Sequence, residues 1–155
     1  MFSLDSLGSI LIMLVVIASV ASGLYMAFSK TNVANTEEDL IVLRMQTQSF
    51  FVGTNYDGLS NEVAMKAGIV PKGLIKGENL RNAWGGDVTL SPDTTNGQFS
   101  IELGNVPQEE CTQLARFQND AWVGVSINGS EIDPTDPAAV ATACGDTNTI
   151  TYKAQ

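Results

Sequence analysis

The chain has 155 residues, 44% of them hydrophobic, and a net charge of −9 that comes from 8 basic and 17 acidic residues. This length allows one globular domain and a separate apolar segment, but not two domains. The acidic balance argues against a nucleic-acid partner, because negative charges on the protein and on a phosphate backbone repel each other.

A long uncharged run opens the chain in residues 6–29 (SLGSILIMLVVIASVASGLYMAFS). A helix of this length crosses a bilayer. Asp5 is the one charge before the run, and Lys30 closes it. A secretory signal peptide has instead a positively charged start, a shorter apolar core and a small-residue cleavage site. We therefore expect a membrane-length helix in which Asp5 has a specific role.

The helical pattern continues beyond the apolar run as an amphipathic half. Its apolar and threonine positions recur at spacings of three and four, at Val33, Thr36, Leu40, Leu43, Thr47 and Phe50. The pattern predicts one continuous helix over residues 2–51, roughly 75 Å long at about 1.5 Å per residue. The chain then divides into an apolar assembly or transmembrane helix over residues 1–29 and a globular domain over residues 30–155. The globular domain includes the amphipathic half, about residues 30–52.

A short helix is predicted next, capped by Ser60 or Asn61 and ended by Gly68 with Pro71. Residues 68–86 (GIVPKGLIKGENLRNAWGG) are rich in glycine and polar groups, which is typical of a connecting loop. Four large apolar side chains anchor this loop in the core: Ile69, Leu74, Leu80 and Trp84.

Alternating apolar residues then predict an antiparallel sheet of about four strands. Residues 87–103 indicate a hairpin around a turn at 91–97. The third strand is predicted from Val123, Val125 and Ile127 and ends at Asn128-Gly129, and the last strand is predicted from Ile150 and Tyr152.

Two further short helices are predicted between the strands. Pro107 opens the first, with Glu109 and Glu110 in its first turn, where acidic residues suit the helix dipole. Asp136-Pro137 is typical of a cap and first turn for the second, which runs to Ala143.

The sequence has two cysteines, Cys111 and Cys144, both in the globular part. In an exported domain an even number of cysteines usually means a disulfide, and this is the leading prediction. The alternative is a pair of buried thiols in a cytosolic domain.

The sequence offers little for catalysis. It contains no histidine, the commonest general base and metal ligand, and its glycines lack the spacing of a phosphate-binding loop. Acidic pairs such as Glu109 and Glu110 are typical of helix starts. We predict no catalytic residue, no metal and no cofactor. One alternative left open is a calcium site formed by Asp133, Asp136 and Asp146.

Asp5 needs an explanation, because a lone carboxylate in hydrocarbon costs several kcal/mol unless it is paired. Residues 1–29 contain no lysine or arginine, so the local cation is an N-terminal amine. In one interpretation Asp5 lies at the membrane surface and complements the helix dipole. In the other the helices form a bundle, and the amine of a neighbouring copy pairs with Asp5 and sets the register.

Taken together, these features resemble a type IV pilin of the type IVb subclass. The start MFSLDSLGSILIMLVVIASVASGLYMAF is similar to a mature pilin whose leader has been removed by prepilin peptidase, and a start at Met1 rather than at a methylated Phe is similar to type IVb. Residues 82–86 (NAWGG) and 105–107 (NVP), with Cys111 inside the following helix, are similar to pilins of thin conjugative pili and adhesive type IVb pili.

Two positions depart from the family pattern. The family has Glu at the position of Asp5, so the carboxylate is kept on a shorter side chain. Many relatives have a helix-breaking Pro where this chain has Ser22 and Gly23. Any local melting of the helix therefore depends on glycine and on β-branched residues.

The resemblance implies an α+β fold, with a long N-terminal helix packed on a four-stranded antiparallel sheet and a C-terminal region closed by a Cys111–Cys144 disulfide. It implies a non-enzymatic structural subunit without a cofactor, which polymerises into a pilus used for adhesion, cell–cell contact or conjugation. The implied assembly residues are Met1, Phe2 and Asp5, and Ser22 and Gly23 are the implied flexible positions.

The implied partners are further copies of the chain in a helical filament, the inner membrane before assembly, prepilin peptidase and the pilus assembly machinery. The implied final location is an extracellular pilus on the bacterial surface. The alternatives are a type II secretion pseudopilin or minor pilin, and a membrane-tethered periplasmic protein.

Overall fold

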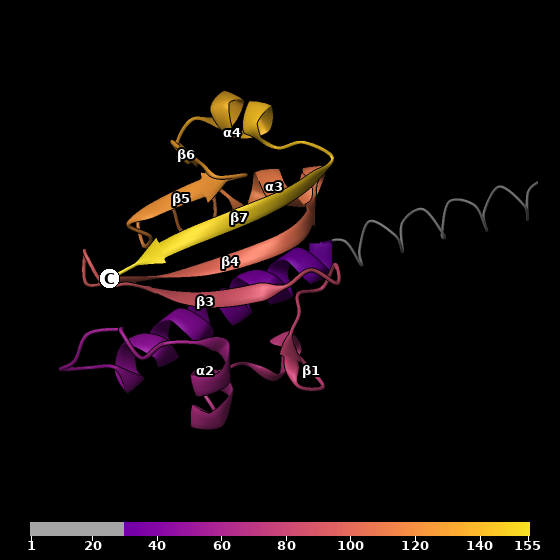
Figure 1. Ribbon diagram of the computed structural model, residues 1–155. Coiled ribbons are helices and arrows are strands. Elements are labelled where there is room, and N and C mark those ends of the chain that lie inside the picture. The colour runs from indigo at the N-terminus through magenta and orange to yellow at the C-terminus, as the bar shows by residue number, and fades with distance from the viewer. Residues whose placement is uncertain (1–29) are drawn as a thin grey trace, which may run out of the picture. The chain divides into compact units, whose positions relative to one another are not determined.

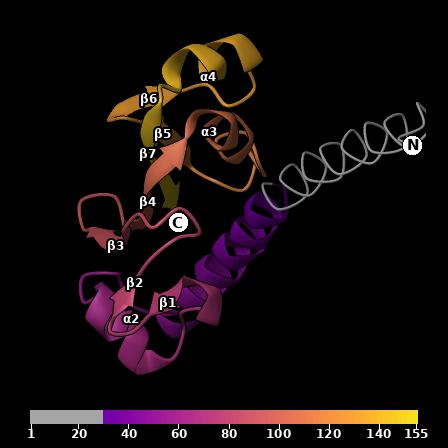
Figure 2. The same cartoon turned by 90° about the vertical axis from the view of Figure 1, so that its right-hand side faces the viewer.

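The structure is a computed structural model that describes residues 30–155 of the chain. An N-terminal helix, helical at every position from 30 to 50, leads into an α+β domain (Figure 1 and Figure 2), and residues 33–155 form one compact unit. The predicted helix over residues 2–29 lies outside the described residues. The further elements are α2 (Asn61–Ala67), η1 (Lys72–Leu74), β1 (Ile75–Lys76), β2 (Asn79–Leu80), β3 (Val88–Asp93), β4 (Gln98–Pro107), α3 (Gln108–Leu114), β5 (Gly124–Ile127), β6 (Ser130–Ile132), α4 (Pro137–Ala143) and β7 (Thr147–Ala154).

The main sheet has five antiparallel strands in the order β3-β4-β7-β5-β6. The four predicted strands are all present. The fifth, β6, pairs with β5 across the turn at Asn128-Gly129, whose φ angles of 52° and 85° suit a tight hairpin. The loop predicted over residues 68–86 also contains a two-stranded ribbon, β1–β2. A strand of two residues is too short to show the alternation of apolar and polar residues from which a strand is predicted.

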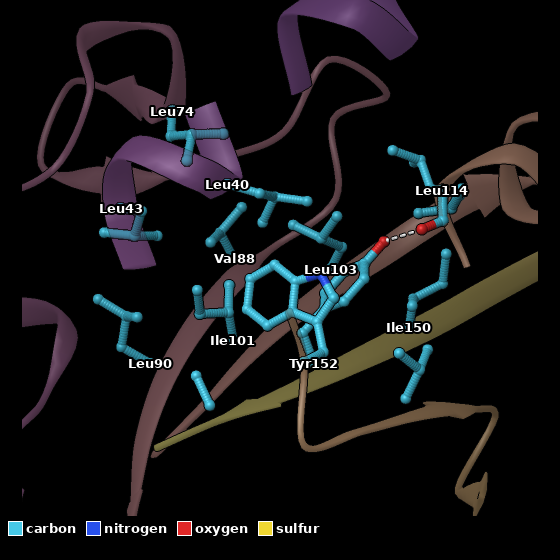
Figure 3. Close-up of a cluster of buried hydrophobic side chains, with 14 of the residues drawn as sticks. Leu40, Leu43, Leu74, Val88, Leu90, Ile101, Leu103, Leu114, Ile150 and Tyr152 are labelled. Atoms are coloured by element: carbon cyan, nitrogen blue, oxygen red, sulfur yellow. Dashed lines mark hydrogen bonds between the residues drawn. The ribbon is translucent and has the colours of Figure 1, made fainter. Parts of the chain in front are cut away.

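The N-terminal helix packs its predicted apolar side on the sheet (Figure 3). Leu40 and Leu43 are fully buried, and Thr47 is buried beside them. The prediction is wrong for Phe50, which is 53% exposed, because the helix ends there and the chain turns. Phe51 packs instead, with its ring centroid 5.6 Å from that of Tyr56.

The predicted helix caps are confirmed. The Ser60 hydroxyl accepts a hydrogen bond from the Val63 amide, and Gly68 ends α2 in the left-handed conformation. The Asp136 carboxylate accepts from two amides at the start of α4. Val123, expected as the first residue of the third strand, lies just before β5 and is 51% exposed, whereas the neighbouring Trp122 is buried.

The loop at residues 82–86 (NAWGG) is fastened to a bulge in β4. The fully buried Asn82 donates from Nδ2 to the carbonyl of Gly104 (2.7 Å), and its Oδ1 accepts from the amides of Trp84 and Gly86 (3.0 Å each). The backbones approach so closely that a Cβ on Gly86 would lie 1.9 Å from the Gly104 carbonyl oxygen. The register of β4 shifts between Leu103 and Val106, and this irregularity lies where the loop docks.

Candidate functional site

The predicted assembly residues Met1, Phe2 and Asp5, and the predicted flexible positions Ser22 and Gly23, all lie outside the residues that the structure describes. Among the helices within residues 30–155, none is both long and apolar enough to span a bilayer. Within the described residues, two features are candidates for a contact site: the region around the Cys111–Cys144 disulfide and the exposed apolar side chains on and after the N-terminal helix.

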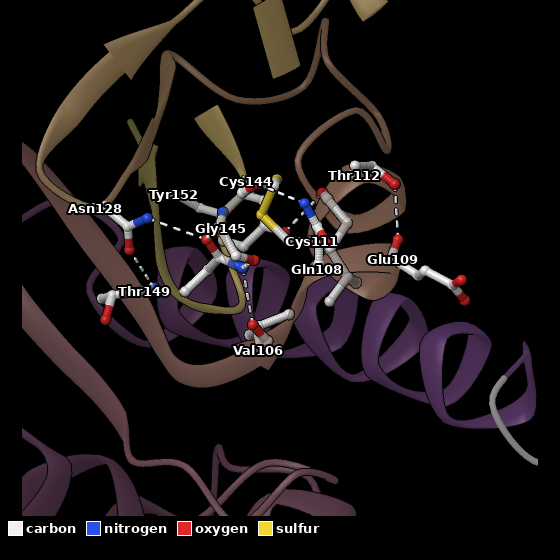
Figure 4. The surroundings of a disulfide bond; sticks show 12 residues. Val106, Gln108, Glu109, Cys111, Thr112, Asn128, Cys144, Gly145, Thr149 and Tyr152 are labelled. Atoms are coloured by element: carbon white, nitrogen blue, oxygen red, sulfur yellow. Dashed lines mark hydrogen bonds between the residues drawn. A yellow bond between two sulfur atoms is a disulfide. The ribbon is translucent and has the colours of Figure 1, made fainter. Parts of the chain in front are cut away.

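The predicted disulfide is confirmed (Figure 4). Cys111 lies in α3 and Cys144 directly follows α4, with their sulfurs bonded and their Cα atoms 6.0 Å apart. Both residues are buried, and the alternative of two free thiols is wrong. The bond closes a segment that contains β5, β6 and α4 (Figure 1), which we call the disulfide-closed region (residues 111–144).

A buried amide network lies beside the disulfide and was missed from the sequence. Asn148, which is 1% exposed, donates from Nδ2 to the carbonyls of Val106 (3.0 Å) and Gly145 (2.9 Å). Its Oδ1 accepts from the Gly145 amide (2.7 Å) and from Nδ2 of Asn128 (3.0 Å). One side chain therefore joins β4, the chain after Cys144 and the β5–β6 turn. Its partners Val106, Gly145 and Asn128 are labelled in Figure 4. Asn148 is polar and belongs to no periodic pattern of apolar residues, so the sequence does not indicate that it is buried.

Aromatic packing holds the chain between α3 and β5 against the domain. The buried Tyr152 hydroxyl donates to the carbonyl of Leu114 at 2.7 Å (Figure 3), and its ring contacts those of Trp122 and Phe117. The guanidinium of Arg44 lies 4.7 Å from the centre of the Trp122 ring. Nη1 of Arg44 and Nε1 of Trp122 are buried without a hydrogen-bond partner among the described residues, and the cation–π contact offsets part of that cost.

Burial perturbs the pKa of Glu37 in the N-terminal helix and of Tyr152 in β7. Burial raises the pKa of the Glu37 carboxyl above its usual value. Burial also raises the pKa of the Tyr152 phenol well above its ordinary value, and the Glu37 charge adds to this rise. The Glu37 carboxylate is therefore less favourable in the folded domain than in the unfolded chain.

We predict that Glu37→Gln increases the free energy of unfolding at pH 7. A raised carboxyl pKa in the folded state means that ionisation opposes folding above that pKa. The penalty disappears as pH falls through the folded pKa towards the ordinary carboxyl range, so the variant and the wild type should converge in acid. Chemical denaturation at a series of pH values measures this. Glu78→Gln, at an exposed position in the β1–β2 turn, is the control, and an equal gain at all pH values would contradict the prediction.

The outer side of the N-terminal helix and the chain that follows it expose apolar side chains. Val42 is 39% exposed, Met45 58%, Phe50 53% and Val52 79%. Val42, Met45 and Phe50 lie on the helix and Val52 follows it. Exposed apolar side chains can become buried when a protein contacts another protein or a membrane. We call these four residues the outer helix surface.

Acidic residues in the disulfide-closed region serve local structure. Oδ1 of Asp133 accepts from the Thr135 amide (2.9 Å) and hydroxyl (2.6 Å), and Asp136 caps α4. Within residues 30–155, no three carboxylate, cysteine or histidine side chains come together as metal ligands, so the alternative of a calcium site at Asp133, Asp136 and Asp146 finds no support there.

The chain matches one protein-family model and several solved structures. The family model described as PilS N terminal matches residues 29–155. No curated protein matches the chain in sequence.

Three solved structures share the fold. A type IVb pilin from Salmonella typhi, solved by crystallography, superposes with a TM-score of 0.61 at 22% identity, covering 79% of this chain and 97% of that chain. TcpA, a type IV pilin from the Vibrio cholerae El Tor biotype, gives 0.57 at 16% identity, covering 81% and 99%. The NMR structure of the type IVb pilin PilS from Salmonella typhi gives 0.55 at 21% identity, covering 78% and 94%. At such identities the likeness shows the fold alone.

Proposed function

We propose, from the premise that the chain belongs to the PilS N-terminal family and is a type IVb pilin, that it polymerises into the filament of a type IVb pilus. The family match carries this proposal, because it covers the whole described domain. The uncharged run of residues 6–29 supports it, since it directly precedes a helix that packs on that domain. We place the division between an assembly helix and a globular domain near residue 29.

Polymerisation requires an apolar surface that is hidden in the membrane before assembly and between subunits afterwards. Residues 6–29 supply such a surface, because a membrane-length apolar helix is stable in a bilayer and also in a bundle of like helices. The outer helix surface offers further apolar side chains that neighbouring copies can cover. Burying these side chains against neighbouring copies contributes about 25 cal/mol per Å² of apolar area.

Asp5 then acts in assembly rather than in folding. In a bundle of apolar helices its carboxylate needs a cation, and we assign that part to the amine of Met1 in a neighbouring subunit, with Phe2 packed beside it. Ser22 and Gly23 form the weakest stretch of the helix, together with the β-branched residues before them, because such residues have low helix propensity. Extension there lets a filament lengthen without losing its bundle.

The route follows from the same proposal. The subunit waits in the inner membrane, prepilin peptidase and the pilus assembly machinery act on it, and the filament is displayed outside the cell, where it serves adhesion, cell–cell contact or conjugation. The acidic domain forms the outside of that filament, and the disulfide suits an extracytoplasmic location.

The test is Asp5→Ala in the full chain, expressed in a piliated host. We expect the variant to reach the membrane at the wild-type level and to form few filaments, because removing one member of a buried charge pair leaves the other unpaired. Membrane fractionation measures the first quantity, and electron microscopy of sheared filaments measures the second.

Asp5→Glu is the matched control, since it keeps the carboxylate and should assemble. Normal filament yield from Asp5→Ala would contradict the assembly role. A variant that is missing from the membrane would show instead that Asp5 is needed for the subunit itself.

A further inference from the structure

Strand β3 lies at one edge of the five-stranded sheet and pairs only with β4 in it. An edge strand exposes backbone N–H and C=O groups that can pair with a strand of another molecule. At high local concentration, copies of a protein can pair through such an edge unless its backbone groups are already occupied.

Asn61, in the first turn of α2, covers the edge of β3. Its Nδ2 donates to the carbonyl of Val88 at 2.8 Å, and its Oδ1 accepts from the amide of Leu90 at 2.8 Å. One carboxamide therefore occupies an acceptor and a donor on β3 that an added strand would otherwise use.

The next edge position is closed in another way. Successive residues of a strand direct their backbone groups to opposite sides, so Pro92 has the same orientation as Leu90. Proline has no N–H, and it is typical of edge strands for that reason. Asn61 and Pro92 thus remove the two amide donors that follow each other along the open side of β3.

The stability of helix α2 does not explain why an asparagine occupies position 61. Ser60 already provides the N-cap, and its hydroxyl accepts from the Val63 amide at 3.2 Å. Asparagine is a weaker helix former than alanine at a position inside a helix. The two contacts with β3 are what its side chain does in this structure.

We propose that Asn61 is a cap on the β3 edge that keeps this strand from pairing with the β3 edge of a second copy of the chain. Removing the cap frees the Val88 carbonyl and the Leu90 amide, and a second copy whose edge is also open provides matching groups. This role is independent of filament formation through residues 6–29.

The test compares Asn61→Ala and Asn61→Asp with Ser60→Ala in the full chain. Ser60→Ala weakens the same helix but leaves the carboxamide in place, so it controls for loss of α2. Each variant is dissolved in micelles of a zwitterionic detergent. The micelles outnumber the protein chains, so two chains seldom share a micelle and contacts through the apolar segment are suppressed. Hydrogen exchange at low protein concentration follows the Leu90 amide, and light scattering counts chains per particle as concentration rises.

We expect the Leu90 amide to exchange about fivefold faster in Asn61→Ala than in Ser60→Ala, which corresponds to one hydrogen bond. We also expect Asn61→Ala to form dimers as concentration rises, while Ser60→Ala does not. Asn61→Asp loses the donor to Val88 but keeps an oxygen that accepts from the Leu90 amide, so it should free the Val88 carbonyl while the Leu90 amide stays protected.

Unchanged Leu90 exchange in Asn61→Ala, or particle sizes for Asn61→Ala equal to those for Ser60→Ala at every concentration, would overturn the proposal. If neither Asn61 variant folds, the wild type decides: a Leu90 amide that exchanges as fast as those of the exposed turn at residues 94–97 would overturn the proposal, and a protected one would support it.

Discussion

Replacing both Cys111 and Cys144 by serine is expected to lower the free energy of unfolding by about 3.5–4 kcal/mol on a chain-entropy estimate. The bond joins residues separated by 33 positions, so its loss gives the unfolded chain many more conformations. A domain of this size has a total stability of about 5–15 kcal/mol, which makes the expected loss a large share. The lower stability should reduce subunit abundance and pilus yield, with little effect on membrane insertion.

The disulfide-closed region should loosen before the rest of the domain. Its outer part is β6 and α4, and between them they bury few large side chains. The Asn148 network joins the end of this region to β4, so the variant should keep a folded sheet while α4 exchanges its amides faster.

Chemical denaturation of the wild type, the double Cys→Ser variant and the reduced wild type measures this effect. Thr142→Ala, at an exposed position in α4, is the control for a change close to Cys144. Equal midpoints for the oxidised and reduced wild type would contradict the prediction. So would quantitative labelling of both cysteines in folded, unreduced protein.

Gly86→Ala is expected to destabilise the domain by about 3 kcal/mol or more, or to prevent folding. Overpacking commonly costs about 1–3 kcal/mol when a flexible side chain can move aside. Here the obstacle is backbone: the new Cβ would lie 1.9 Å from the Gly104 carbonyl oxygen and 2.4 Å from its carbon. Separating the two segments would also break the buried bond from Asn82 Nδ2 to the Gly104 carbonyl.

Gly104→Ala is a matched control on the other side of the same approach. A Cβ there would lie 3.6 Å from the backbone nitrogen and oxygen of Asp87, which is ordinary contact, so this variant should remain near wild-type stability. Thermal unfolding of the two variants side by side tests the difference. Equal stabilities for Gly86→Ala and Gly104→Ala would show that the close approach does not hold the loop in place.

The features that could be predicted from the sequence are those whose signal is local. Leu40 and Leu43 follow from helical spacing, and the Ser60 and Asp136 caps follow from side chains that bond to amides two or three residues away. The pairing of Cys111 with Cys144 followed because there were only two cysteines. These predictions need no knowledge of which distant segments meet.

The features that were missed depend on contacts between distant segments. Asn61 reaches β3, Asn82 reaches β4, and Arg44 reaches Trp122. A polar residue that serves a distant backbone looks in the sequence like any surface residue, since it belongs to no apolar period. In the sequence, residues 82–86 carry only a resemblance to a family motif. In the structure, a carboxamide and a glycine of this motif fasten the loop to β4.

The assignment as a pilus subunit is tested most directly by electron microscopy of material sheared from cells that produce the wild-type chain, with mass spectrometry of the purified filaments. We predict long thin filaments in which this chain is the main protein, and loss of those filaments in Asp5→Ala cells whose membranes still contain the subunit. Cells that hold the wild-type chain in their membranes but form no filaments under any growth condition, or filaments from which the chain is absent, would contradict it.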